Sequence, residues 1–315
     1  TTLLSLLVFS ANAQDANSYP SKPVRIIVNF PPGGTVDVMT RGVAQKLTEK
    51  WGQAVVVDNR PGAGGNIGAQ AVASAEPDGY TLLATPPGPM TINQYLYKDM
   101  RFDPAKLSSV IMMASVPNAI AARIDFPANN VKELIAYTKA NPGKVSFGSQ
   151  GNGSTSHLTG QMFATMVGSD MMHIPFKGEG PALTEILGGR VDLFLGNISA
   201  VLKLYQNKQI KLLGVASPKR SPMANEIPAS QEFGMPDFVA SAWFAIAAPP
   251  GTPAPIVNKL NAAILEALKL PDTQQKMAAL GGEVVGGSPA DMTTMVIAER
   301  ARWKKVIETA NVKLD

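Results

Sequence analysis

The sequence predicts an α/β protein in which a mostly parallel sheet is covered by helices and the chain is divided into two lobes. Three observations support this prediction. From Val24 onward, short runs rich in β-branched residues alternate with helical patterns. The same alternation restarts near Asn129, after a less regular stretch. The chain then ends in helical segments, which we expect to pack back on the first set of strands.

The first set begins with "VRIIVNF", a short apolar run that predicts a buried strand. Apolar residues then recur at three- and four-residue steps, which predicts one face of a helix formed by Val36, Met39, Val43, Leu47 and Trp51. "AVVVD" is the next expected strand. A glycine-rich loop, an alanine-rich helix ending at Pro77-Asp78-Gly79 and the strand "YTLLAT" complete this set.

The second set begins with a helix over "NNVKELIAYTKANPGK", for which Asn130 is the expected N-cap and Glu133 completes a capping box. The strands that follow are "VSFG", "MMHIPF", "VDLFLG" and "IKLLGVAS". Helices are expected over "STSHLTGQMFATMVG", over "GPALTEILGG" and from about Ser199. After "ASAWFAIAAPPGTP" the final helices are predicted over Pro253 to Leu268, Asp272 to Leu280 and Pro289 to about Thr309.

Composition excludes several classes of protein. Hydrophobic residues make up 45% and charged residues 17% of the 315 residues, which suits a globular protein with a sizeable core. The net charge of +4 comes from scattered lysines and arginines, whereas a nucleic-acid binder clusters them, so we expect no nucleic-acid partner. The absence of cysteine rules out disulfides and thiolate chemistry, and two histidines give no metal-binding spacing, so we expect neither metal nor cofactor.

The N-terminal stretch "TTLLSLLVFSANAQ" resembles a secretory signal peptide. An apolar run from Leu3 to Phe9 precedes Ala11-Asn12-Ala13, a small-x-small cleavage site. We predict cleavage after Ala13 and export to the periplasm. The alternative is a frayed apolar N-terminus; a membrane span is disfavoured because the run is far shorter than the roughly 20 residues needed to cross a bilayer.

Three strand-to-helix junctions are rich in glycine and small polar residues: Phe30 to Thr35, Gly62 to Asn66, and Gly148 to Ser154. In open α/β sheets such junctions lie at the carboxyl ends of parallel strands, where ligands bind. The exposed N–H groups and the positive dipole end of a helix favour a bound anion. Glycine has no Cβ and lets the backbone approach that anion closely. A Cβ added at Gly34 is therefore expected to block the anion. Three tight turns without a ligand are the alternative.

The loops do not match the nucleotide-binding patterns. "GAGGNIG" has Ile67 where the third glycine of the dinucleotide fingerprint belongs, and "GNGSTS" lacks the lysine of a P-loop. A small carboxylate therefore suits the loops better than a diphosphate. A serine hydrolase using Ser149 or Ser154 with His157 remains an alternative, although Phe147 replaces the first glycine of a nucleophile elbow. His173 is as well explained as a core histidine.

Five ordered blocks make the chain resemble the extracytoplasmic solute receptors of tripartite tricarboxylate transporters, the Bug family. The blocks are "YPSKPVRIIVNFPPGGTVDVMTR", "VDNRPGAGGNIGAQAVASAEPDGYTLL", "FGSQGNGSTSHL", "HIPFKGEGPALTEILGGRVDLF" and "APPGTPAPIVNKLNAAI", and the resemblance runs from about Tyr19 to the C-terminus. It implies a two-lobed, type II-like periplasmic binding-protein fold that closes like a flytrap, with the hinge crossed near Ala121 and Ala240. Residues 1–13 would be the signal peptide, 14–121 with 241–315 the first lobe, and 122–240 the second.

The resemblance also implies a non-catalytic site in which backbone groups of both lobes hold a small organic carboxylate. We expect Asp37 and Asn66 to have structural roles in their loops. Asn197 stands where many relatives carry an aspartate. The asparagine is expected to remove a negative charge from the pocket and to suit a second carboxylate or a neutral group rather than an ammonium group on the ligand. Carried over by position, the ligand-binding residues are Phe30, Pro31, Gly33, Gly34, Thr35, Val36, Thr85, Pro86, Ser149, Gly151, Asn152, Gly153, Ser154, His157, Phe176, Lys177 and Asn197.

The expected partners are the carboxylate ligand and the integral-membrane subunits of a transporter, and a monomer is expected. A ligand-sensing module of the same fold, which would act on a signalling receptor, is an alternative that the sequence does not separate from transport.

Overall fold

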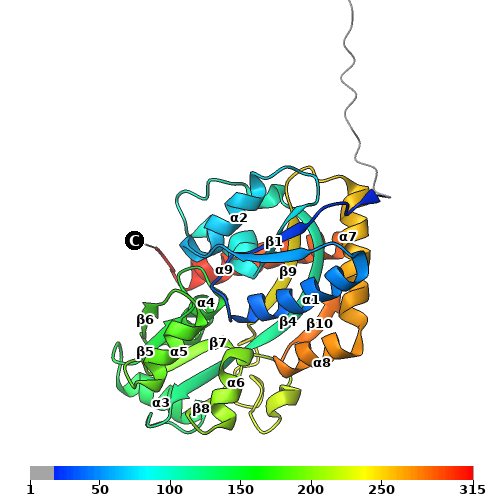
Figure 1. Ribbon diagram of the computed structural model, residues 1–315. Coiled ribbons are helices and arrows are strands. Elements are labelled where there is room, and N and C mark those ends of the chain that lie inside the picture. Colours follow the sequence, from blue (N-terminus) through cyan, green and yellow to red (C-terminus); the bar gives the residue numbers. More distant parts are fainter. Residues whose placement is uncertain (1–17, 315) are drawn as a thin grey trace, which may run out of the picture.

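The computed structural model describes residues 18–314, and the expected signal peptide lies outside them. In the described chain the strands form one sheet in the order β2-β1-β3-β9-β4-β7-β5-β6, while β8 and β10 also pair with β4. Figure 1 shows two groups of strands and helices, with β4 running from one group into the other. The α/β class predicted from the alternating pattern is therefore confirmed.

The first strand set is parallel at its centre. β1 (Val24–Val28) pairs with β2 (Val55–Asn59) and with β3 (Thr81–Thr85). The connecting helices are α1 (Thr35–Trp51) and α2 (Asn66–Ala73), and α1 buries the predicted face from Val36 to Leu47. The return strand β9 (Ser241–Ala248) lies antiparallel to β3. Between β2 and β4 the chain also forms short helical turns at Ala63–Gly65, Gly88–Ile92, Asn93–Tyr95 and Pro104–Lys106.

The second strand set repeats this plan. β5 (Ser146–Ser149) pairs in parallel with β6 (Met172–Pro175) and β7 (Leu193–Asn197). The side chain of Asn130 accepts a hydrogen bond from the Glu133 N–H, so the predicted cap is confirmed. The remaining elements are α3 (Val131–Ala140), α4 (Thr155–Val167), α5 (Glu179–Leu187), α6 (Ile198–Gln206), β8 (Ile210–Val215) and a short turn at Pro222–Ala224.

β4 (Ser108–Arg123) joins the two sets and makes the sheet mixed, so the prediction of a mostly parallel sheet is wrong. Its first ten residues pair with β9, and from Asn118 onward it pairs with β7 and β8. All of these pairings are antiparallel. The lobe boundaries placed near Ala121 and Ala240 stay a prediction, and β4 passes through Ala121 without interruption.

The C-terminal helices α7 (Ala254–Lys269), α8 (Pro271–Ala279) and α9 (Pro289–Thr309) match the predicted ranges closely, and the short strand β10 (Glu283–Gly286) lies between the last two. α7 and α8 cover the first set, as expected. α9 contacts both sets: Met292 and Val296 are buried with residues of the first, whereas Trp303 and Ile307 share a buried cluster with Phe163 and Phe238.

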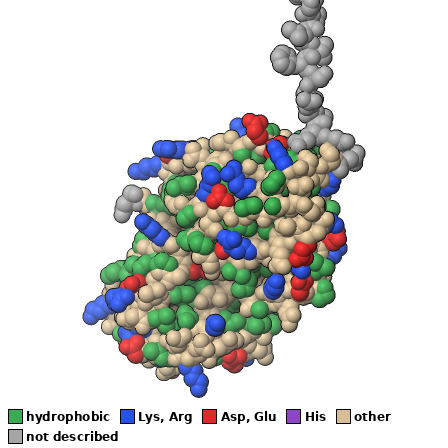
Figure 2. Space-filling view, in the orientation of Figure 1, with side chains coloured by type: hydrophobic (Ala, Val, Ile, Leu, Met, Phe, Trp, Pro, Cys, Tyr) green, Lys and Arg blue, Asp and Glu red, His purple; other side chains and the backbone are tan. Residues whose placement is uncertain are grey.

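The surface shows charges of both signs interspersed. On the face in Figure 2, lysine and arginine side chains are scattered among acidic, apolar and other polar ones. Within residues 18–314, no helix combines the length and the apolar character needed to cross a bilayer.

Candidate functional site between the two strand sets

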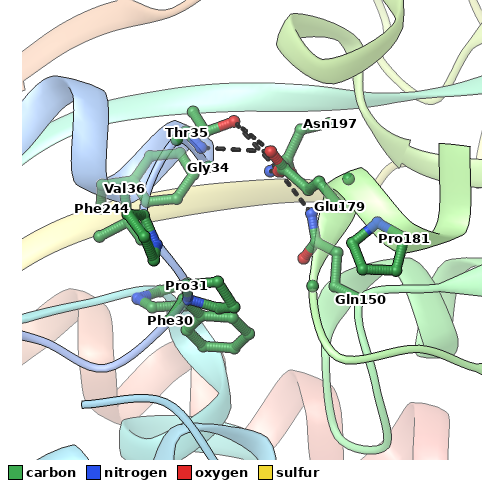
Figure 3. A pocket seen from close by; sticks show the side chains of 15 residues that line it. Phe30, Pro31, Gly34, Thr35, Val36, Gln150, Glu179, Pro181, Asn197 and Phe244 are labelled. Atoms are coloured by element: carbon green, nitrogen blue, oxygen red, sulfur yellow. Dashed lines mark hydrogen bonds between the residues drawn. The ribbon is translucent and has the colours of Figure 1, made fainter. Parts of the chain in front are cut away.

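A cavity of about 190 Å³ lies where the β1–α1 loop of the first set faces the start of α5 and the end of β7 in the second. Figure 3 shows residues of the two sets on opposite sides of it. Most of its wall is apolar or backbone. It is lined by residues 30–36, Pro86, Gln150, residues 178–181, Asn197 and Phe244.

The β1–α1 loop is shaped by Gly33 and fixed by Asp37. Gly33 has a φ of +83°, a left-handed conformation that favours glycine, and its N–H donates to Asp37 Oδ2 at 2.9 Å. Arg41 and Asn59 also donate to Asp37. Burial alone would raise the pKa of Asp37, but the hydrogen bonds from Arg41, Gly33 and Asn59 outweigh it and hold that pKa below its ordinary value. These contacts suit the structural role expected for Asp37.

Gly34 is not required by the backbone in the way that Gly33 is. It has an extended conformation with φ −75° and is the N-cap of α1. A Cβ on Gly34 would lie 3.6 Å from the Pro31 carbonyl and 3.7 Å from Glu179 Oε2, which are ordinary contact distances. The loop itself therefore accommodates a methyl group at Gly34, and the expectation that a Cβ there blocks the anion stays a prediction.

Glu179, the first residue of α5, reaches across the cavity to the first set (Figure 3). Its carboxylate accepts hydrogen bonds from the Thr35 N–H at 3.2 Å and from Thr35 Oγ1 at 3.0 Å. Gln150 Nε2 and Asn197 Nδ2 each donate to it at 2.6 Å. Burial raises the pKa of Glu179, and the hydrogen bonds from Asn197 and Thr35 offset only part of that rise.

The sequence reasoning missed Glu179, which places a carboxylate in the pocket. Asn197 was expected to remove the negative charge that an aspartate would bring, and its amide nitrogen donates to the Glu179 carboxylate. The local sequence "KGEG" does place an acid at the first helical position after a glycine. The dipole of any helix favours an acid there, so this pattern alone did not indicate a binding residue. That Glu179 meets Thr35, 144 residues away along the chain, has no local signature.

Two histidines, His157 and His173, form hydrogen bonds with the glycine-rich loop from Ser149 to Ser154. Ser149 Oγ lies 2.7 Å from His173 Nε2, and His157 Nδ1 accepts a hydrogen bond from the Gly153 N–H at 3.4 Å. The two imidazole rings stack with centroids 3.9 Å apart. Burial, with a further contribution from His173, lowers the pKa of His157 to about 3, and burial lowers that of His173 to about 4. Both rings are therefore neutral near pH 7.

This arrangement does not support the serine hydrolase. Ser149 pairs with His173 and not with His157, and Ser154 is the N-cap of α4. In the chain from residue 18 to 314, no carboxylate is hydrogen-bonded to either ring, so the orienting acid of a catalytic triad is absent there. Within the same residues, no three His, Asp or Glu side chains are grouped to hold a metal ion.

A second cavity of about 440 Å³ adjoins the first and shares Phe30, Pro31, Gln150 and Gly178 with it. The remainder of its wall comes from Asn29, residues 61–65, Tyr97, Gly151, Asn152 and residues 175–177. The predicted Phe176 and Lys177 lie here, and Lys177 is exposed. The structure thus divides the predicted residues between two compartments.

Several predicted residues line neither compartment. Ser149, Gly153 and Ser154 belong to the 149–154 loop but line neither cavity. His157 lines a separate cavity together with residues 310–314. Thr85 is buried and accepts a hydrogen bond from Asn29, so it supports the wall. Asn66, expected to be structural, is buried and accepts from Asn93 Nδ2 at 2.6 Å.

Comparison with known proteins gives consistent matches. The model of the tripartite tricarboxylate transporter family receptor matches residues 39–312. Protein BugT of Bordetella pertussis (strain Tohama I) is 37% identical over 322 residues, which cover 100% of this chain and 99% of BugT.

Two solved structures show the same fold. An R. palustris protein solved with adipate has a TM-score of 0.91 and 38% identity, covering 94% of this chain and 100% of that one. The periplasmic binding protein BugD has a TM-score of 0.88 and 36% identity, also covering 94% and 100%. The periplasmic binding-protein fold predicted for this chain is therefore confirmed.

Proposed function

Because this chain belongs to the family of tripartite tricarboxylate transporter receptors, we propose that it binds a small organic carboxylate between its two strand sets in the periplasm. The single observation that carries the proposal is the cavity shared by the β1–α1 loop and the 149–154 segment, whose sequence positions lie more than 100 residues apart. The solved R. palustris relative contains adipate, a dicarboxylate, which supports this ligand class.

Unpaired backbone donors at the start of α1 provide the binding chemistry. In the described chain the N–H groups of Gly34 and Val36, both lining the cavity, have no acceptor. The first N–H groups of a helix have no partner within the helix and carry its partial positive charge, so together they favour a carboxylate. A ligand bound here touches both sets and therefore favours the closed arrangement of the two lobes.

The finer parts of the proposal concern localisation and partners. The N-terminal pattern of residues 1–13 supports export, and the family supports delivery of the ligand to integral-membrane transporter subunits. The receptor acts as a monomer and without catalysis. Residues 14–121 with 241–315, and residues 122–240, form the two lobes.

Thermal denaturation with a panel of organic acids tests the proposal. A ligand that binds only the folded state stabilises it by RT ln(1 + [L]/Kd), or about 2.7 kcal/mol at a concentration of 100 times Kd. We expect at least one small carboxylate to raise the melting temperature in a dose-dependent way, with isothermal titration giving one site per chain. Absence of a shift with every mono-, di- and tricarboxylate of up to six carbons would contradict the proposed function.

A further inference from the structure

The charge of the smaller cavity is unusual for a site that takes an acid. Among the residues that line it, Glu179 is the only one with an ionisable side chain. Its hydrogen-bond donors, Thr35, Gln150 and Asn197, are all neutral. No ion pair involves Glu179 in the described residues. The partial positive charge at the start of α1 offsets its charge only in part.

Glu179 is partly buried, with its carboxylate bound by these neutral donors. A carboxylate shielded from water without a cation is destabilised, because neutral donors satisfy its lone pairs but leave its charge uncompensated. Lys177, two residues before Glu179 in the sequence, lies on the wall of the adjoining cavity and is exposed. Burial raises the pKa of Glu179, and the hydrogen bonds from neutral Asn197 and Thr35 lower it. A cationic group on the ligand would supply the missing counter-charge.

Asn197 provides an independent observation that points to a donor on the ligand. Its side chain is 2% exposed and lines the cavity, and its Oδ1 has no hydrogen-bond partner in the described chain. The orientation of the amide follows from Glu179, which binds the Nδ2 side and leaves Oδ1 as the free acceptor. Buried acceptors are almost always paired, so a donor is missing here.

The side of the cavity formed by the first strand set requires a hydrogen-bond acceptor on the ligand. The free N–H groups of Gly34 and Val36 are donors and suit a carboxylate. The site therefore presents donors from the first strand set and acceptors, one of them charged, from the second. An ammonium group has three donors and no acceptor, so it suits Glu179 and Asn197 together.

We propose that Glu179 is a specificity-determining residue, which with Asn197 selects carboxylic acids that carry an ammonium group beside the carboxylate, that is, amino acids. This inference rests on the proposed function and names the ligand class within it. It reverses the expectation that Asn197 suits a second carboxylate. An acid without a donor places its own negative charge or an apolar carbon against the two acceptors.

Isothermal titration at pH 7.5 with matched acids tests the inference. The panel compares the unsubstituted, 2-hydroxy and 2-amino dicarboxylic acids of four, five and six carbons. The unmodified chain is compared with Glu179→Gln, which keeps the size of the side chain, and with Glu185→Gln, the same charge change on the same helix but outside both cavities. Melting temperatures establish that each variant is folded.

In the unmodified chain and in Glu185→Gln, we expect the best amino acid to bind at least about tenfold more tightly than its unsubstituted counterpart, with the hydroxy acid between them. In Glu179→Gln we expect this preference to fall to about threefold or less. Binding without a preference for amino acids, a preference for hydroxy acids over amino acids, or a preference that persists in folded Glu179→Gln would overturn the inference and leave the proposed function intact. Absence of binding by all nine acids would overturn the inference, whereas the proposed function is contradicted only if the wider panel of mono-, di- and tricarboxylates also fails to shift the melting temperature.

The measurements on the unmodified chain decide the inference even if Glu179→Gln fails to fold, because unsubstituted acids that bind as tightly as amino acids would already refute it. If Glu179→Gln is unstable, Glu179→Asp replaces it. Aspartate keeps the charge but shortens the side chain, so the preference for amino acids is expected to persist in that variant.

Discussion

Mild acidification is expected to weaken the fold through two histidines. The chain has only two, His157 and His173, and they form the stacked pair beneath the 149–154 loop. Their pKa values in the folded protein are lowered from 6.5 to about 3 and about 4. The unfolded chain therefore binds protons below pH 6.5 that the folded chain does not, so stability is complete above that pH and falls as the pH drops towards 4.

The size of the loss follows from linkage. Between pH 7.5 and 5.5, a histidine with a pKa of 6.5 when unfolded and below 4.5 when folded costs about 1.4 kcal/mol, and two such groups cost about 2.7 kcal/mol. Paired carboxylates add little in this window, because their unfolded pKa values lie near 4. Glu179 acts in the opposite sense, since its raised pKa makes the folded state bind the extra proton as the pH falls.

Urea unfolding at constant ionic strength, followed by tryptophan fluorescence, measures the effect at pH 7.5, 6.5 and 5.5. His157→Asn keeps an acceptor near Nδ1 for the Gly153 N–H, and His173→Gln keeps a polar atom near Nε2 for Ser149. Each variant should lose about half of the pH dependence. Glu179→Gln should show a slightly larger acid-induced loss than the unmodified chain.

Two results would refute this reasoning. One is a free energy of unfolding that stays within about 0.5 kcal/mol between pH 7.5 and 5.5, well below the 2.7 kcal/mol expected. The other is an undiminished pH dependence in the double variant, which would assign the protons to other groups.

Three further predictions concern the loops. Gly178→Val places a Cβ 3.1 Å from Pro31 Cγ at a residue with φ +112°, so we expect ligand affinity to fall at least about tenfold. Gly42→Ala, with open space around its Cβ and outside both cavities, should bind normally in titration. Thr35→Val removes the hydroxyl between Glu179 and Ser199 and should cost about 1–2 kcal/mol in urea unfolding; no loss would show that this contact is weak. Asp37→Asn should cost about 2–3 kcal/mol at pH 7, because Arg41 and the Gly33 N–H lose a charged acceptor, and equal stability of variant and parent would contradict its structural role.

The helices and parallel strands could be predicted because each carries its own periodic pattern. α1 buries the face marked by Val36 and Leu47, and α9 has the range that its capping serine and proline indicate. β4 could not be predicted in the same way. "SSVIMMASVPNAIAAR" is apolar without alternation and contains Pro117 and Asn118 where the strand changes partners. Only the pairing with β9, β7 and β8, all distant in sequence, makes it one strand.

The site shows the same division between local and distant information. The β1–α1 loop and the 149–154 loop were found because glycines and helix starts are local signals, and both loops contribute to both of the adjoining cavities. Pro31 and Gly178 line both cavities, and a Cβ added at Gly178 would lie 3.1 Å from Pro31 Cγ, a close approach of the two strand sets that no local pattern shows. Glu179 was missed for the same reason, since its role depends on Thr35.

The hydrogen bonds of Glu179 divide unequally between the strand sets, and this division sets the order in which a ligand would be recognised. Gln150 and Asn197 belong to the same set as Glu179, whereas Thr35 belongs to the other. If the two strand sets separated, Glu179 would lose only its hydrogen bonds to Thr35 and would keep those to Gln150 and Asn197. The two acceptors, the Glu179 carboxylate and Asn197 Oδ1, would therefore stay together. The N–H groups of Gly34 and Val36 would move away with α1. An acid with an ammonium group could then be bound first through its cation, and closure would add the carboxylate contacts, so the energy of closure would depend on both charges of the ligand.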